Sequence, residues 1–134
     1  MPQTTVKKIV SQARAAQAKF ETATQEVVDE LIAGLAWAII EPVTNRSLAK
    51  QAVLETGLGN VEDKIIKNQR KTLGLLRDLK NAISCGIIRE IPEQGLIEIA
   101  RPVGLVGAVT PSTNPIATPL NLSLIHISEP TRPY

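Results

Sequence analysis

Apolar residues recur with helical spacing through residues 6–79 and divide this part of the chain into four segments. The pattern predicts helices over residues 6–20, 25–40, 46–56 and 61–79. The second of these carries apolar side chains around so much of its circumference that several neighbours must cover it, and we expect Trp37 to lie in that core.

Local signals indicate where the third and fourth helices begin and end. Asn45 and Asn60 are predicted N-caps, and Gly57 follows Thr56 in the position that tolerates a left-handed backbone. The predicted buried face of the fourth helix consists of Ile65, Ile66, Gln69, Leu73, Leu76 and Leu79. The basic residues Lys64, Lys67, Arg70, Lys71 and Arg77 are predicted to form a solvated face, with a basic groove for an anionic cofactor as the alternative.

The pattern changes after Lys80, where short β-branched stretches replace the helical period. Residues 86–88 and 96–100 flank the turn sequence at 92–95, which predicts a β-hairpin. An isolated hairpin is marginally stable in water, so we expect it to pair with another sheet or another subunit. Residues 104–109 then form an apolar run without alternation, typical of a central parallel strand covered on both faces.

Small polar residues follow directly where this apolar run ends, between prolines 111, 115 and 119. In α/β proteins, ligands bind at the carboxyl ends of strands, so this is the predicted site. Asn114 has two interpretations: an N-cap for a helix that begins at Pro115, or an amide that donates to negative charge developing on a substrate oxygen.

Composition narrows the function classes. The net charge of +2, with basic and acidic residues interspersed, gives no electrostatic support for nucleic-acid binding. No apolar run approaches the roughly 20 residues of a membrane span, no secretory leader is recognisable, and the single cysteine excludes an internal disulfide. We therefore expect a cytoplasmic protein, and we assign no metal site. Aromatic residues make up only 2% of the chain, which indicates a helical layer that packs against something further.

Two motifs carry a family resemblance: ETGLGNVEDKIIKNQ at residues 55–69 and ARPVGLVGAVTPSTNPIATPLN at residues 100–121. Both resemble the aldehyde dehydrogenase superfamily, in its CoA-acylating branch of acetaldehyde, propionaldehyde and sulfoacetaldehyde dehydrogenases, and the pair looks most similar to the sulfoacetaldehyde type. The resemblance implies an α/β fold: the N-terminal part of a Rossmann-like nucleotide-binding domain over residues 1–121, with four helices, a hairpin at 86–100 for homo-oligomerisation, and then a central parallel strand.

The resemblance also implies a chemistry. In the family, a cysteine thiolate attacks a small aldehyde, the thiohemiacetal passes hydride to NAD or NADP, and coenzyme A releases the acyl group from the thioester. Asn114 matches the asparagine of the oxyanion hole, and Val109, Thr110 and Pro111 match the loop beside the nicotinamide. Cys85 lies outside the motif that would carry the nucleophile and is interpreted as a small buried hydrophobe. The catalytic cysteine and the coenzyme A site are absent, so the chain alone is expected to be inactive.

The last residues, LSLIHISEPTRPY at 122–134, depart from the family pattern and resemble a translated sequencing adapter. We therefore predict a truncated domain with a non-native tail, and we assign no role to His126. Two alternatives remain: a non-enzymatic helical module that binds a partner through its unpaired hairpin and uncovered strand, and, within the resemblance, a fragment of a non-acylating aldehyde dehydrogenase.

Overall fold

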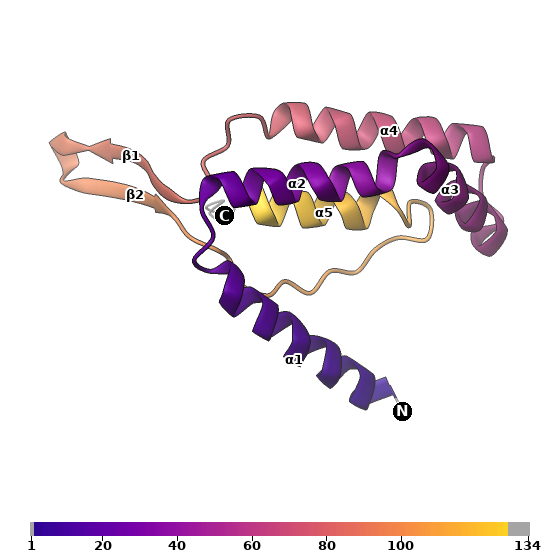
Figure 1. Ribbon diagram of the computed structural model, residues 1–134, viewed down its shortest axis with the longest axis horizontal. Coiled ribbons are helices and arrows are strands. Elements are labelled where there is room, and N and C mark those ends of the chain that lie inside the picture. Colours follow the sequence, from indigo (N-terminus) through magenta and orange to yellow (C-terminus); the bar gives the residue numbers. More distant parts are fainter. Residues whose placement is uncertain (1, 129–134) are drawn as a thin grey trace.

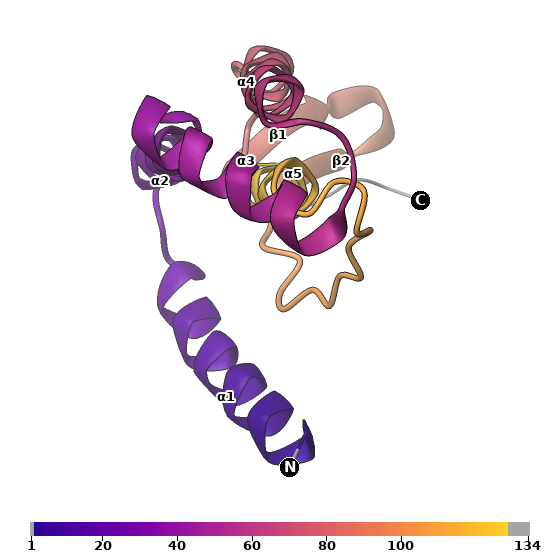
Figure 2. The same cartoon turned by 90° about the vertical axis from the view of Figure 1, so that its right-hand side faces the viewer.

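Four helices occupy the first part of the chain in the order that the hydrophobic pattern predicts. In the computed structural model, which describes residues 2–128, α1 spans Pro2–Phe20, α2 Gln25–Ile40, α3 Pro42–Thr56 and α4 Val61–Asp78 (Figure 1). A fifth helix, α5, spans Ala117–Ser128 and lies alongside α2 and α4. Three roughly aligned helices therefore form the body of the molecule, and α3 closes one end (Figure 2).

The core lies between α2 and α5. Val28, Ile32 and Ala36 recur every fourth residue along one face of α2 and are buried against Leu120 and Leu124 of α5. Partly buried side chains of α4 and of its C-cap pack onto the same cluster, namely Leu75, Leu76 and the C-cap residue Leu79. This aliphatic core explains how the chain forms a helical layer with so few aromatic residues.

The predicted hairpin is confirmed and projects from the end of the helical body (Figure 1). β1 (Gly86–Ile91) pairs antiparallel with β2 (Leu96–Ala100) across the short 3-10 turn η1 (Pro92–Gln94). The register slips by one residue at Ile88, which is a β-bulge. Apolar side chains of the hairpin remain exposed: Ile87, Leu96, Ile97 and Ile99.

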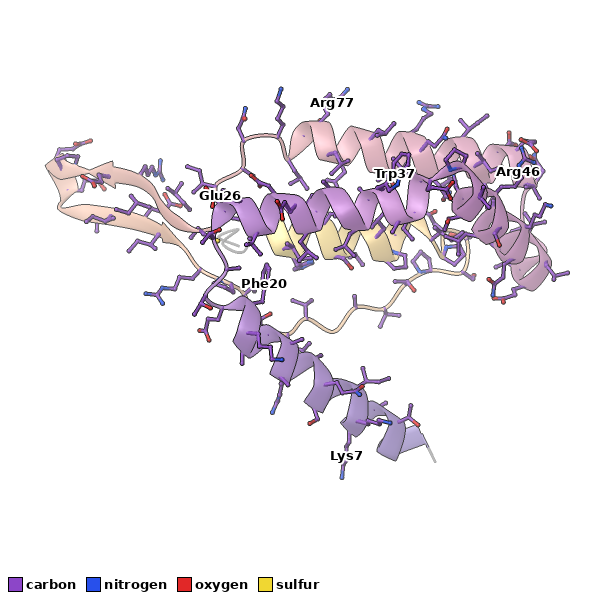
Figure 3. All side chains as sticks on the ribbon, in the orientation of Figure 1. Lys7, Phe20, Glu26, Trp37, Arg46 and Arg77 are labelled. Carbon is purple, nitrogen blue, oxygen red and sulfur yellow. The ribbon has the colours of Figure 1, made fainter. Side chains whose placement is uncertain are left out.

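Helix α1 extends away from the body and touches it only near its C-terminal end (Figure 2). Phe20 points back toward the core cluster, whereas Lys7 points away from the rest of the chain (Figure 3). Val6 and Ile9, on the apolar stripe of this helix, are correspondingly exposed.

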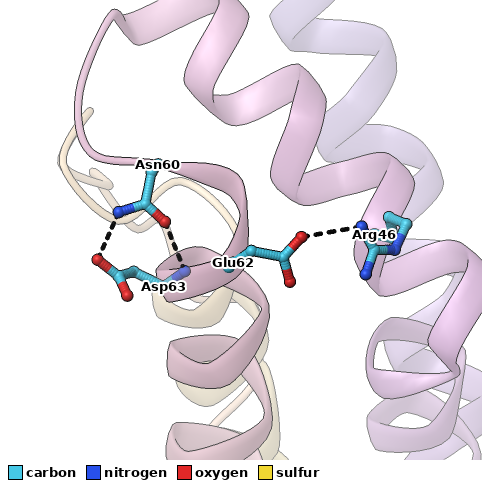
Figure 4. A network of polar contacts seen from close by, with 4 residues as sticks. All are labelled: Arg46, Asn60, Glu62 and Asp63. Carbon is cyan, nitrogen blue, oxygen red and sulfur yellow. Dashed lines mark hydrogen bonds and ion pairs between the residues drawn. The ribbon is translucent and has the colours of Figure 1, made fainter.

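The ends of α3 and α4 follow the expected chemistry with one exception. Gly57 ends α3 with φ of 66°. Asn60 caps α4: its Oδ1 accepts from the Asp63 N–H at 2.9 Å, and its Nδ2 donates to the Asp63 carboxylate at 2.6 Å (Figure 4). The exception is α3, which begins at Pro42 with Glu41 as N-cap, so the prediction of Asn45 as a cap is wrong. Hydrogen bonds from the backbone N–H groups of Thr44 and then Val43 hold the pKa of Glu41 below its usual value.

Two predictions of burial in the helices need correction. Of the predicted inward face of α4, Leu76 and Leu79 pack against the core, whereas Ile66 and Leu73 are exposed. The buried residues of α4 are Lys64, Asn68 and Thr72. Trp37 is 61% exposed, because α4 and α5 cover only the face of α2 that carries Val28, Ile32 and Ala36. The helical period was read correctly, but the face that points inward is set by polar contacts.

The predicted central strand at residues 104–109 is not formed. Residues 101–111 run as an irregular segment beneath the helices, and within the described part of the chain the backbone groups of 101–110 make no hydrogen bond to other backbone groups (Figure 1). A strand requires a neighbour to pair with, and the two strands of the described residues pair only with each other. The apolar run therefore remains solvated instead of entering a sheet.

The helix after the site begins at Ala117 rather than at Pro115 and extends into the segment predicted to be non-native. Residues 122–128 belong to α5, with Leu124 fully buried. Residues 129–134 lie outside the described part, and the adapter origin of 122–134 stays a prediction. Between residues 2 and 128, the structure contains no helix with the length and apolar character needed to cross a membrane.

Candidate functional site

The polar loop before α5 is built on a tight turn. The N–H of Asn114 donates to the carbonyl oxygen of Pro111 at 3.3 Å, which is the bond that closes a four-residue β-turn. Ser112 and Thr113 form the exposed corner of this turn. The turn holds the backbone of Asn114 in place three residues before α5 begins.

Asn114 is half-buried, and its side chain is uncommitted. Within residues 2–128 its amide makes no hydrogen bond, and the first backbone bond of α5 runs from Leu120 to Ile116. The interpretation of Asn114 as an N-cap is therefore not confirmed, since α5 begins at Ala117 and the Asn114 side chain accepts from none of the backbone N–H groups in the described residues. The amide N–H₂ remains available to a ligand.

The three residues predicted to face a nicotinamide lie immediately before this turn. Val109, Thr110 and Pro111 are all exposed, Val109 completely so. The hydrogen bond of the turn brings Pro111 into direct contact with Asn114. Val109 and Thr110 lie next to this turn with their side chains exposed to solvent.

Thr110 also borders a cavity of about 420 Å³ between residues 102–110, α5 and the end of α1. The lining is largely apolar, and its side chains with polar atoms come from four parts of the chain: Gln17, Ser84, Thr110, Ser123 and His126. No lysine or arginine lines this cavity. Asn114 does not line the cavity either. The cavity and the predicted oxyanion residue are therefore connected only by residues 110–114 of the loop.

His126 and Cys85 share this cavity, yet neither forms a catalytic arrangement. Nδ1 of His126 lies 2.7 Å from the carbonyl oxygen of Leu122, one turn earlier in α5, so that nitrogen carries the proton. Cys85 is half-buried and packs against the aliphatic core. This agrees with its interpretation as a small hydrophobe.

One residue at the site was missed by sequence reasoning. Lys64 was placed on the solvated face of α4, but it is only 8% exposed, and its Nζ donates to the carbonyl oxygen of Thr113 at 3.4 Å. The signal that was available is its spacing from Asn68 and Thr72. These three polar residues recur every fourth position and form the inward face of α4.

Comparison with known proteins gives a consistent set of relatives, although no family model matches the chain. The acylating sulfoacetaldehyde dehydrogenase of Cupriavidus necator is 58% identical over 113 residues, which are 84% of this chain and 23% of that protein. The acylating sulfoacetaldehyde dehydrogenase of Bilophila wadsworthia is 46% identical over 114 residues, 85% of this chain and 25% of that protein. The aldehyde-alcohol dehydrogenase of Clostridium acetobutylicum is 42% identical over 130 residues, covering 95% of this chain and 15% of that protein.

A solved structure agrees with these relatives. The acetylating aldehyde dehydrogenase of Geobacillus thermoglucosidasius superposes with a TM-score of 0.87 at 38% identity, covering 94% of this chain and 27% of that one. The chain thus spans about a quarter of the length of the sulfoacetaldehyde dehydrogenases that it matches.

Proposed function

We infer that this chain, a homologue of the acylating aldehyde dehydrogenases, supplies the helical layer and the oxyanion loop of an enzyme that oxidises a small aldehyde to an acyl-CoA. The overall reaction is aldehyde, coenzyme A and NAD(P)⁺ to acyl-CoA, NAD(P)H and a proton. The names of the relatives make sulfoacetaldehyde the first aldehyde to test. The remaining parts of the reaction machinery, including the nucleophilic cysteine and the coenzyme A site, would come from polypeptide outside these 134 residues.

The observation that carries this proposal is the state of Asn114. Its backbone is fixed by the turn bond to Pro111, while its side-chain amide has no partner within the described residues. An N–H₂ group that is positioned in advance stabilises an oxyanion without reorganising when the charge develops. In the proposed enzyme, Asn114 therefore donates to the substrate oxygen while a thiolate from elsewhere is bonded to the carbonyl carbon.

The residues beside Asn114 fit one wall of a nicotinamide site. Val109, Thr110 and Pro111 are exposed and have no bulky side chain, so a planar ring can lie against them. The bound cofactor would accept hydride at this position. The neighbouring cavity has no lysine or arginine in its lining, so it offers no permanent positive charge to the phosphates of a dinucleotide.

The hairpin supports a second part of the proposal, which is assembly with another copy of the chain. β1 and β2 contact little apart from each other and η1, and four large apolar side chains of the hairpin are exposed. Such a surface is typical of a contact between subunits. We therefore assign the hairpin to homo-oligomerisation of the complete enzyme.

The enzymatic role can be tested by grafting residues 2–128 into the Geobacillus enzyme in place of the matching segment. We expect this chimera to form NAD(P)H only when both an aldehyde and coenzyme A are present. Asn114→Ala should lower kcat by about 10²–10³-fold, the usual effect of removing one oxyanion donor. Ser112→Ala, in the exposed corner of the same turn, is the matched control and should leave kcat unchanged.

The isolated 134-residue chain provides the complementary measurement, and it should show no aldehyde-dependent and coenzyme A-dependent reduction of NAD(P)⁺. Turnover by the isolated chain would contradict the proposal that the nucleophile lies elsewhere. A chimera that is active and insensitive to Asn114→Ala would contradict the oxyanion role.

A further inference from the structure

We propose that Lys64 is a positioning residue for the oxyanion loop, holding Asn114 in place by binding the carbonyl group of Thr113. The proposal rests on the role assigned to Asn114 above. It connects the two motifs at 55–69 and 100–121, because the first supplies the lysine and the second supplies the loop.

The burial of Lys64 is the first step. The residue is 8% exposed, and among the described residues its ammonium group forms no ion pair: the salt bridges there are Arg46–Glu62, Arg77–Asp78 and Arg89–Glu98. Burying a charge is costly unless it is compensated by polar contacts. The carbonyl oxygen of Thr113 is the polar contact that the described residues give this buried ammonium group, so the charge of Lys64 favours keeping that carbonyl close.

The surroundings of Lys64 direct its side chain toward the loop. A Cβ added at Gly59 would lie 3.7 Å from Cε of Lys64, so the turn before α4 runs alongside the end of the lysine stem. Gly59 has φ of 72°, which favours glycine at this position. On the same inward face of α4, Asn68 donates to Oδ1 of Asn45 at 2.8 Å, and Asn45 donates to the carbonyl of Ile65 at 3.2 Å. These bonds tie α4 to α3 and fix the backbone from which Lys64 extends.

The loop is consequently held on both sides of the peptide bond that joins Thr113 to Asn114. The Thr113 carbonyl accepts from Lys64 at 3.4 Å, and the Asn114 N–H donates to Pro111 at 3.3 Å. The two contacts use the two polar groups of one peptide plane. Fixing that plane fixes the Cα of Asn114 and leaves its side chain as the free group.

The first experiment measures loop order directly in the 134-residue chain by NMR. In the unmodified protein, the Lys64 ammonium protons should exchange with water more slowly than those of the exposed Lys67 on the same helix. Lys64→Met should accelerate amide exchange at Asn114 by about tenfold or more, while amides of the α2 core keep their rates. Lys64→Arg should restore part of the protection, because it retains a cationic donor. Lys67→Met is the matched control and should change neither.

The second experiment separates this inference from the proposed function by using the chimera. If Lys64 acts through Asn114, Lys64→Met should lower kcat with little change in KM, and it should have no further effect on kcat in an Asn114→Ala background. The positioning role would be overturned, even in an active chimera, by either of two results. One is an amide exchange rate at Asn114 that Lys64→Met does not change, and the other is exchange of the Lys64 ammonium protons as fast as that of Lys67. If Lys64→Met raises the amide exchange rate at Asn114 but Asn114→Ala leaves kcat of the chimera unchanged, the oxyanion role is overturned. The anchoring of the loop by Lys64 then still holds.

Discussion

Replacing Leu124 by alanine tests whether the segment after residue 121 is an integral part of the fold. Leu124 is 0% exposed and lies at the centre of the contact between α5 and the Val28–Ile32–Ala36 face of α2. It is also the largest of the fully buried side chains. The substitution removes three carbon atoms from the only aliphatic cluster that joins these helices in the described part of the chain.

The expected cost follows from this burial. Truncation of a fully buried leucine to alanine lowers the free energy of unfolding by about 2–5 kcal/mol, because the transfer energy of the removed carbons is lost and a cavity remains. A small domain has only about 5–15 kcal/mol of stability in total. We therefore expect Leu124→Ala to remove a large fraction of the stability of this chain.

Urea denaturation followed by far-UV circular dichroism measures the effect. Leu54→Ala is the matched control, because Leu54 is 85% exposed and its truncation should change the free energy of unfolding by less than about 0.5 kcal/mol. If the two variants unfold at the same urea concentration, α5 does not pack as described, and residues 122–128 contribute nothing to the core.

Three further predictions use other parts of the structure. Asn45→Ala leaves the buried side-chain amide of Asn68 without its acceptor, and it should lower the free energy of unfolding by about 1–3 kcal/mol, measured by the same urea titration. Glu41 has a folded-state pKa below its unfolded value, so its contribution to stability is present above the unfolded pKa of about 4.3 and is lost as the pH falls through the lower folded pKa. Thermal unfolding measured between pH 6 and about 3 should therefore show a smaller decrease for Glu41→Gln than for the unmodified chain, and equal decreases would refute the capping role. Ile97→Lys should reduce self-association in sedimentation velocity, whereas Glu93→Lys in the turn should not; equal sedimentation of both variants would argue against the hairpin as a subunit contact.

The sequence predicted the elements of this fold better than their contacts. The helical period predicted the first and last residues of α2 correctly. Gly57 ends α3 and Asn60 caps α4, as expected, and the turn residues at 92–95 located the hairpin. These features depend on residues close together in the chain, so local patterns suffice to find them. Ends without such a signal were missed: Glu41 caps α3 through its side chain, although glutamate is not a favoured N-cap residue.

The errors concern features that depend on distant residues. Residues 104–109 have the composition of a central strand, but composition cannot provide the neighbouring strands that a sheet needs. Asn114 was predicted correctly to lie in a polar loop. That its side-chain amide forms no hydrogen bond within the described residues follows only from the structure, in which α5 begins at Ala117. Lys64 was assigned to solvent because a run of basic residues on a helix usually forms a solvated face. Its hydrogen-bond partner lies 49 residues further along the chain, so no local pattern reveals it.

The orientation of α4 shows how directional contacts can outweigh the hydrophobic pattern. Ile66 and Leu73 are each 52% exposed, while Asn68 and Thr72 of the same helix are buried. Rotating α4 to bury the apolar pair would break the bonds from Asn68 to Asn45 and from Asn45 to α4 itself, leaving buried amides unpaired at about 1–3 kcal/mol each. Apolar cover, in contrast, can be provided by any complementary surface, and exposed apolar patches of this kind mark contact surfaces. The inward polar row is therefore the side of α4 that fixes its place against α3 and aims Lys64 at the loop, whereas the outward apolar side is free to bind further polypeptide.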